Sequence, residues 1–117
     1  MHLAYYDPAK TTRLTVDASP YGLWAILSNI DQDGAVRNVA YASRSLTPTE
    51  QRYSQTEREA LAVVWGCERF HMYLIGTTFE LITDHKALEI ISSSKPSARI
   101  ERWALRLQQY EYKVIYK

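Results

Sequence analysis

The chain has 117 residues, of which 46% are hydrophobic and 23% charged, which suits a single domain that buries its core without metal or disulfide support. The single cysteine, Cys67, excludes an internal disulfide framework, and with no Cys-x-x-Cys or Cys/His cluster there is no zinc signature. With 14 basic and 13 acidic side chains, the net charge of +1 gives no general attraction to polyanions, so any contact with nucleic acid must come from local clusters of Arg and Lys.

No segment has the composition of a linker, a membrane span or a signal peptide. Gly and Pro number only four each, and the uncharged run between Glu59 and Glu68 is far shorter than the roughly 20 residues that cross a bilayer. The N-terminus lacks a basic stretch followed by an apolar one. We therefore expect one continuous domain over residues 1–117, intracellular and without a membrane anchor.

Three strands in an antiparallel meander are predicted for the first part of the chain. Residues 12–19 alternate apolar and polar side chains, and residues 21–30 and 35–45 are rich in strand-compatible side chains. Between the last two segments, residues 31–34 have the composition of a turn, in which Gly34 can take a positive φ.

Two helix-capping patterns follow the predicted meander. Thr47 precedes a proline at the first helical position, and Ser54 is followed three residues later by Glu57. The second pattern predicts a helix from about Gln55 to Leu74. Its apolar residues recur at spacings of three and four, which requires one face to pack against a sheet. These residues are Ala60, Val63, Val64, Cys67, Phe70 and Leu74.

The remaining segments complete a mixed α/β order. A short strand at 79–83 is followed by one or two helical turns at 85–92, a second helix at 98–110 capped by Ser97, and a strand at 111–117. The order βββαβααβ indicates a mixed five-stranded sheet flanked by helices.

Several residues with reactive or charged side chains have structural interpretations. His71 is expected to be a hydrogen-bonded core or boundary residue, and Cys67 a small buried apolar group. Arg99, Arg102 and Arg106 share one face of the second helix. This stripe has two interpretations, a surface that follows a phosphate backbone and an ordinary solvated helix face.

Two acidic residues stand at the ends of predicted strands. Asp17 interrupts the strand at 12–19, although Asp is depleted in strands, and Asp84 closes the strand at 79–83. Ligands of open α/β sheets bind at the carboxyl ends of strands, so two acids there can share a hard cation. A turn or helix-cap role is the alternative, and it is stronger for Asp84 because a predicted helix begins directly after it.

The predicted helix at 55–74 offers two candidates for a third acid, Glu57 and Glu59. At 100° per residue, each lies at a border of the apolar stripe, on opposite sides, so periodicity does not choose between them. Glu57 also has a role in the capping box. If three carboxylates converge without cysteine or histidine, the preferred metal is Mg²⁺ or Mn²⁺ rather than zinc.

The segments that carry these acids resemble the ribonuclease H domain of Ty3/gypsy-type retrotransposon reverse transcriptases. The motifs are TVDAS at 15–19, YSQTEREALAVVW at 53–65 and FELITDHKAL at 79–88, and AYASRSLTPTEQRYS at 40–54 is also similar to the family. The resemblance covers about residues 3–117. It implies a ribonuclease H-like fold with the mixed five-stranded sheet inferred above.

Carried over position by position, the resemblance implies that Asp17, Glu59 and Asp84 are the catalytic and metal-binding residues. It implies hydrolysis of the RNA strand of RNA/DNA hybrids with Mg²⁺ or Mn²⁺, one ion activating a water and the other stabilising the departing 3′-oxygen. It also implies a polymerase domain in the same polyprotein as a partner, and a location in the cytoplasm or the retroelement particle.

The chain departs from the family pattern at its C-terminal end. The family has a fourth acid, an Asp beyond the strand at 111–117 that is followed by a last helix, and here no Asp follows Asp84. We therefore expect a chain that is truncated within the domain and lacks the C-terminal helix, with an incomplete ligand set. The alternative function is a noncatalytic module that docks on a polymerase or nucleic acid. Ser19, His85 and Lys86 adjoin the three acids and are the candidates for substrate contacts.

Overall fold

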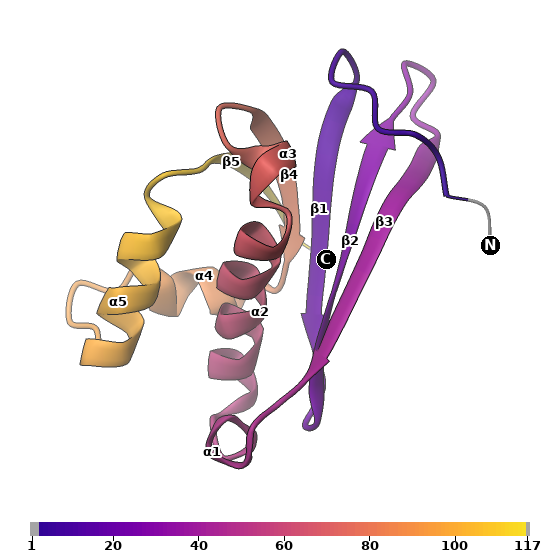
Figure 1. The fold of residues 1–117 in the computed structure, drawn as a ribbon. Coiled ribbons are helices and arrows are strands. Elements are labelled where there is room, and N and C mark those ends of the chain that lie inside the picture. Colours follow the sequence, from indigo (N-terminus) through magenta and orange to yellow (C-terminus); the bar gives the residue numbers. More distant parts are fainter. Residues whose placement is uncertain (1–2, 117) are drawn as a thin grey trace.

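A five-stranded mixed sheet forms one layer of the structure, and the helices form a second layer against one of its faces (Figure 1). This computed structural model describes residues 3–116. The strands are β1 (Thr11–Ala18), β2 (Gly22–Ile30), β3 (Val36–Ser45), β4 (Thr78–Thr83) and β5 (Glu111–Tyr116). The helices are α1 (Pro48–Gln51), α2 (Gln55–Arg69), α3 (His71–Leu74), α4 (His85–Ile91) and α5 (Ala98–Leu107). The predicted mixed five-stranded sheet with its accompanying helices is confirmed.

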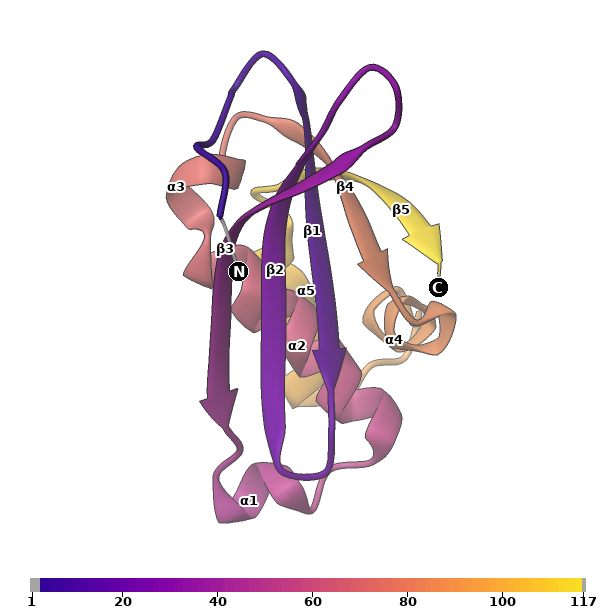
Figure 2. The same ribbon diagram turned by 90° about the vertical axis from the view of Figure 1, so that its right-hand side faces the viewer.

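The strand order is β3-β2-β1-β4-β5, and it combines an antiparallel half with a parallel half. β1 pairs with β2 and β2 with β3 in antiparallel fashion, whereas the β1–β4 and β4–β5 pairs are parallel. The carboxyl ends of β1, β4 and β5 therefore lie at the same edge of the sheet, as their arrowheads show in Figure 2. This edge is where the topology of an open α/β sheet places ligands.

The predicted caps are present at the starts of the helices. Thr47 and Ser54 each form a complete capping box, with Glu50 and Glu57 as the third helical residues. The Ser97 side chain accepts a hydrogen bond from the Ile100 amide and so caps α5. These caps are local, because each side chain reaches a backbone amide three residues ahead in the chain.

The helix predicted over 55–74 is divided at Phe70, which corrects the expected single helix. Phe70 ends α2 with φ −109° and ψ 27°, outside the helical range, and α3 begins at the next residue. Phe70 and Leu74, at and after the break, are both buried, and the Phe70 ring packs against Tyr73. The break therefore lies in the backbone of Phe70, whose angles end the regular helical hydrogen-bond pattern of α2.

The second predicted helix is shorter than its pattern suggested. It ends at Leu107 instead of Tyr110, and the Tyr110 amide donates to the Leu107 carbonyl in a tight turn. Tyr110 is nevertheless buried, and its hydroxyl lies 2.7 Å from His71 Nδ1. The predicted boundary role of His71 is confirmed. The strand predicted over 111–117 is β5, and Lys117 lies outside the described residues.

The core lies between the sheet and α2. All six apolar stripe residues of the predicted 55–74 helix are buried, including Cys67, which has no exposed surface. Gly66 lets the helix approach the strands closely, because a Cβ placed there would lie 2.7 Å from Val16 Cγ1. Burial raises the pKa of the Cys67 thiol to about 12.

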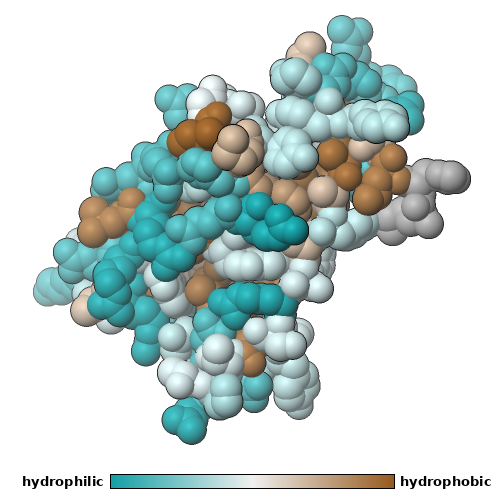
Figure 3. All heavy atoms as spheres, in the orientation of Figure 1, coloured by the Kyte–Doolittle hydropathy of each residue, from teal (hydrophilic) through white to brown (hydrophobic). Residues whose placement is uncertain are grey.

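The outer surface of the helix layer is mainly hydrophilic, with apolar residues scattered among charged ones (Figure 3). Figure 2 shows the opposite face of the sheet, with α2, α3 and α5 behind it. No helix within residues 3–116 is long and apolar enough to span a membrane.

Candidate active site

Asp17 lies at the carboxyl end of β1, on the face of the sheet away from the helix layer. Its neighbours Val16 and Ala18 are buried, whereas Asp17 is half-buried and is paired in register with Trp24 of β2. Side chains alternate between the two faces of a strand, which separates Asp17 from the core. The Ala18 amide donates a hydrogen bond of 2.9 Å to Asp17 Oδ1. This contact orients the carboxylate at the strand end.

Asp84 occupies the corresponding position on the neighbouring strand. The last pair of the parallel β1–β4 ladder is Thr15 with Ile82, and Asp17 and Asp84 each follow two residues later. Continuing this register by two residues would bring the two acids to the same level, Asp17 within β1 and Asp84 directly after β4. Asp84 is also the N-cap of α4, because its Oδ1 accepts a hydrogen bond of 2.9 Å from the Lys86 amide. The helix-cap role considered from the sequence is thus present.

Glu57 and Glu59, which periodicity did not distinguish, have different surroundings. Glu57 Oε1 accepts a hydrogen bond from the Ser54 amide, and Glu57 Oε2 accepts one of 2.8 Å from Arg99 of α5. One oxygen of Glu57 thus caps the start of α2, and the other joins α2 to α5. Glu59 is half-buried, and its Oε1 accepts a hydrogen bond of 3.1 Å from Gln55 Nε2.

Gln55 connects the helix acid to the end of β1. Its Nε2 donates to the Ala18 carbonyl at 3.0 Å as well as to Glu59. Ala18 is therefore linked to both acids: its amide donates to Asp17, and its carbonyl accepts from Gln55, which also donates to Glu59. Gln55 was not among the candidates predicted from the sequence, although its spacing of four residues from Glu59 places both side chains on one helix face.

Among residues 3–116, no three His, Cys, Asp or Glu side chains are grouped closely enough to be recognised as a metal site. Asp17, Glu59 and Asp84 nevertheless border one edge of the sheet, through the strand register and the Gln55 contact. Each supplies carboxylate oxygens, which are the ligands that Mg²⁺ and Mn²⁺ prefer. The chemistry of this donor set fits a hard divalent cation.

The three candidate substrate-contact residues flank the acids and also make local contacts. Ser19 Oγ accepts hydrogen bonds from the Tyr21 and Gly22 amides and so holds the β1–β2 turn. His85 Nε2 lies 2.8 Å from Glu89 Oε1, and the exposed Lys86 is the second residue of α4, after the Asp84 cap.

Most of this chain matches a known protein family. The model of the RNase H-like domain found in reverse transcriptase matches residues 7–110. The chain belongs to this family. The match includes all three acids, so the proposed site lies wholly within the RNase H-like domain.

Relatives of this RNase H-like domain occur in retrotransposon polyproteins. The retrovirus-related Pol polyproteins of Drosophila melanogaster transposons opus and 297 are 38% and 40% identical, over 98% and 94% of this chain. The Tf2-3 polyprotein of Schizosaccharomyces pombe is 31% identical over 98% of it. The chain spans 12%, 10% and 9% of the lengths of these polyproteins. It is therefore similar to one segment of each.

Solved structures share the fold of this RNase H-like domain. The foamy viral protease-reverse transcriptase in complex with RNA/DNA hybrid superposes with a TM-score of 0.75 at 19% identity, over 98% of this chain and 16% of that one. RNase H1 from the archaeon Halobacterium salinarum gives a TM-score of 0.60 at 14% identity, over 92% of this chain and 85% of that one.

The arginine stripe of the RNase H-like domain is partly used to join helices. Arg99 pairs with Glu57, and Arg106 pairs with Glu68, so that two of the three guanidinium groups link α5 to α2. The hydrogen bond to Glu68 raises the pKa of Arg106 further. These contacts identify a packing role that neither interpretation of the stripe had included.

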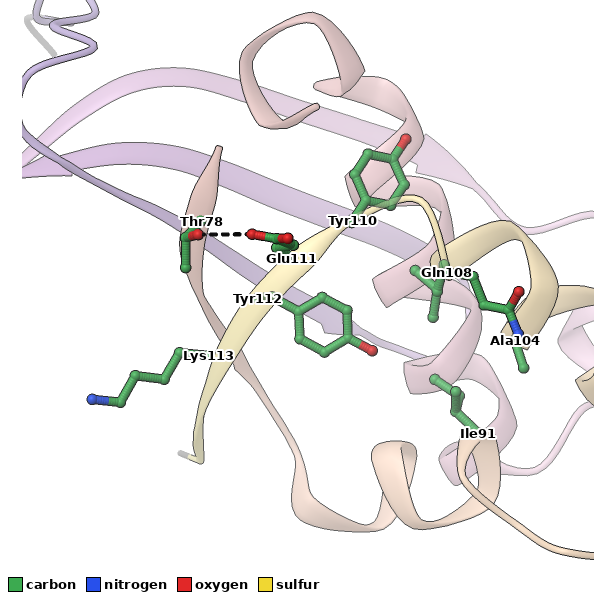
Figure 4. A pocket seen from close by; sticks show the side chains of 9 residues that line it. Thr78, Ile91, Ala104, Gln108, Tyr110, Glu111, Tyr112 and Lys113 are labelled. Atoms are coloured by element: carbon green, nitrogen blue, oxygen red, sulfur yellow. Dashed lines mark hydrogen bonds between the residues drawn. The ribbon is translucent and has the colours of Figure 1, made fainter. Parts of the chain in front are cut away.

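A separate hollow of about 400 Å³ lies between β5 and the ends of α4 and α5. In Figure 4 the Tyr112 ring extends from β5 toward Ile91 and Ala104, and Thr78 donates a hydrogen bond of 3.0 Å to Glu111. Partial burial raises the pKa of Tyr112. None of the three candidate acids lines this hollow, so it is distinct from the site at the strand ends.

Proposed function

We propose that this RNase H-like domain is a metal-dependent endonuclease that hydrolyses the RNA strand of RNA/DNA hybrids as part of a retrotransposon polyprotein. The observation that carries the proposal is that Asp17 in β1 and Asp84 directly after β4 each lie two residues beyond the last pair, Thr15 with Ile82, of the parallel β1–β4 ladder. Glu59 joins them from the helix layer through Gln55 and the Ala18 carbonyl. Three carboxylates from three elements at one sheet edge suit phosphodiester hydrolysis.

Asp17, Glu59 and Asp84 would hold the metal in this proposal. Mg²⁺ or Mn²⁺ would supply charge neutralisation at the phosphodiester and a bound water of lowered pKa. The carboxylates themselves are oriented by the protein, Asp17 by the Ala18 amide and Glu59 by Gln55. Orientation of the ligands before the metal binds reduces the entropy that must be lost in forming the site.

The proposed partners follow from the same site. An RNA/DNA hybrid would approach the sheet edge, where Ser19, His85 and Lys86 flank the acids and offer hydroxyl and cationic groups to its sugars and phosphates. The polymerase domain of the same polyprotein is the second proposed partner, in the cytoplasm or the retroelement particle. The structure of a foamy viral relative in complex with RNA/DNA hybrid supports this substrate class.

Cleavage of the RNA strand of a labelled hybrid, with Mg²⁺ or Mn²⁺, tests the proposal. The assay uses this chain and a longer polyprotein segment that continues beyond Lys117. Asp17→Asn and Glu59→Gln should each reduce cleavage by at least about 100-fold, because loss of a ligand charge weakens the metal site. Glu101→Gln is the matched control, because it makes the same change at an exposed acid on α5. It should leave cleavage unchanged.

Metal binding is measured on the same proteins by the broadening of NMR signals with Mn²⁺. Broadening centred on residues 17, 59 and 84 supports the nuclease. Undiminished cleavage by Asp17→Asn would overturn the assignment. Absence of both cleavage and specific broadening in the longer segment would favour the noncatalytic docking module instead.

A further inference from the structure

We propose that Gln55 is a positioning residue that holds Glu59 against the end of β1, an inference that rests on the proposed nuclease function. Gln55 begins α2, and Glu59 follows one helical turn later. Nε2 of Gln55 lies 3.1 Å from Glu59 Oε1 and 3.0 Å from the Ala18 carbonyl oxygen. One amide group therefore links the acid of the helix layer to the strand that carries Asp17.

The orientation of the Gln55 amide follows from its three partners. Ala18 and Glu59 present only acceptor oxygens, which require the two N–H groups of Nε2. The third partner, Arg58, is a donor, and its Nη2 lies 2.6 Å from Gln55 Oε1. A flipped amide would place oxygen against oxygen at Ala18 and Glu59, so only one orientation satisfies all three contacts.

Arg58 anchors this arrangement to the segment before α2. Its Nη1 donates to the carbonyls of Tyr53 and Gln51, while Nη2 donates to Gln55. The guanidinium is planar and its donors have fixed directions, so these contacts hold Gln55 in one place relative to the end of α1. The position of Glu59 is in this way coupled to the α1–α2 connection.

A free glutamate side chain samples several rotamers, and fixing it upon metal binding has an entropic cost. The Gln55 contact fixes the Glu59 carboxylate before the metal arrives. It also keeps that carboxylate at the end of β1 rather than in the solvent beside α2. Loss of a residue that orients a metal ligand weakens metal affinity by about 10- to 100-fold. Because Gln55 is exposed to solvent, we expect the lower end of that range.

The test replaces Gln55 by methionine, which keeps the length of the side chain and removes its hydrogen-bonding groups. Gln51→Met is the matched control, because Gln51 also donates from its side chain to a backbone carbonyl, that of Leu46, at 3.2 Å. Within residues 3–116, the Gln51 side chain forms no hydrogen bond with Glu59. Both variants are compared with the unaltered chain in its metal-free and metal-loaded states.

The first measurement is the mobility of the Glu59 side chain by ¹³C NMR relaxation in the metal-free protein. Gln55→Met should lower the order parameter of Glu59, and Gln51→Met should not. This measurement does not depend on catalysis, so it tests the positioning even if the chain does not cleave RNA. An unchanged Glu59 order parameter in Gln55→Met would overturn the inference.

The second measurement is the Mn²⁺ dissociation constant, together with the KM and kcat for a hybrid. Gln55→Met should raise the Mn²⁺ dissociation constant about 10-fold, with kcat restored at saturating metal and KM unchanged. A rise in KM alone would instead assign Gln55 to direct contact with the hybrid and reject the positioning role. Failure of the unaltered protein to bind metal would reject the proposed function, and the Glu59 mobility would then decide the positioning separately.

Discussion

Arg99 of α5 donates a hydrogen bond of 2.8 Å to Glu57 of α2, although the two residues are 42 positions apart in the chain. The Arg99 guanidinium also lies 4.1 Å from the centroid of the Tyr53 ring, where it makes a cation–π contact. Glu57 is thereby occupied by helix packing and by its capping box. Glu59 is the glutamate of this pair that is linked to the strand end, through Gln55.

Arg99→Ala should lower the free energy of unfolding by about 1 kcal/mol, because it removes a partly exposed ion pair and a cation–π contact. Urea unfolding measures this change. Arg102 lies on the same helix but forms no ion pair within residues 3–116, so Arg102→Ala should change stability by less than about 0.5 kcal/mol. Equal effects of the two substitutions would show that the Arg99 contacts contribute nothing.

Gly66→Ala should destabilise the fold by about 1–2 kcal/mol despite the better helix propensity of alanine. The added Cβ would lie 2.7 Å from Val16 Cγ1 and 3.4 Å from Ala25 Cβ. Valine cannot turn away easily, because its branched side chain has few allowed rotamers. Chemical denaturation of Gly66→Ala, Val16→Ala and the double variant tests this. The double variant should be more stable than additivity predicts, and strict additivity would contradict the clash.

The pair of Glu50 and Arg44 should make stability depend on pH in the acidic range. The hydrogen bond from Arg44 lowers the pKa of Glu50 below its ordinary value of 4.5. The unfolded chain therefore takes up a proton at Glu50 more readily than the folded chain does. Above pH 4.5 the pair contributes fully to the free energy of unfolding. This contribution is lost as the pH falls through the lower pKa that Glu50 has in the folded state.

Glu50→Gln tests this because glutamine retains the capping box but not the charge. The loss of unfolding free energy between pH 7 and pH 3 should be about 1 kcal/mol smaller in this variant, measured by urea unfolding at each pH. Glu101→Gln serves as the control. An acid dependence identical to that of the unaltered chain would contradict the role of the pair.

Cys67 should be protected from thiol reagents in the folded protein. It has no exposed surface, and burial raises its pKa from 9.0 to about 12. Only the thiolate reacts, so at pH 8 modification should occur only when the protein opens. The rate of reaction with a disulfide reagent, with and without urea, measures this. Rapid reaction of the folded chain would show that the α2 core face opens readily.

The same thiol predicts a loss of stability at high pH. The folded state keeps the Cys67 proton up to a pKa of about 12, whereas the unfolded state releases it near 9.0. The unfolded state is therefore favoured as the pH rises above 9.0, and the contribution of the neutral thiol declines. Cys67→Ala should have a flatter stability profile between pH 8 and pH 10, measured by urea unfolding.

Features that depend on neighbouring residues in the chain were predictable. The Thr47 and Ser54 capping boxes and the apolar face of α2 follow from spacings of three and four, and the structure confirms them. The break at Phe70 was not predictable in this way. Phe70 and Leu74 both belong to the apolar stripe and both are buried, so the helical period continues through the break and gives no sign of it.

The candidate site also combines features that were predictable from the sequence with features that depend on tertiary contacts. Asp17 and Asp84 were recognisable as acids at strand ends, but their common level depends on the parallel register of β1 and β4. Periodicity left Glu57 and Glu59 equivalent. The Arg99 contact with Glu57 and the Gln55 contact with Ala18 distinguish them.

Residue type and spacing thus established the helices, the strands, the acidic candidates and the resemblance to a family, because these depend on interactions within a few residues. The tertiary structure decided that Glu59 is linked to the end of β1 and that Glu57 joins α2 to α5. The residues in these two contacts are 37 and 42 positions apart in the chain. Such partners meet only after strand register and helix packing have brought distant backbone segments together, and no local pattern encodes that geometry.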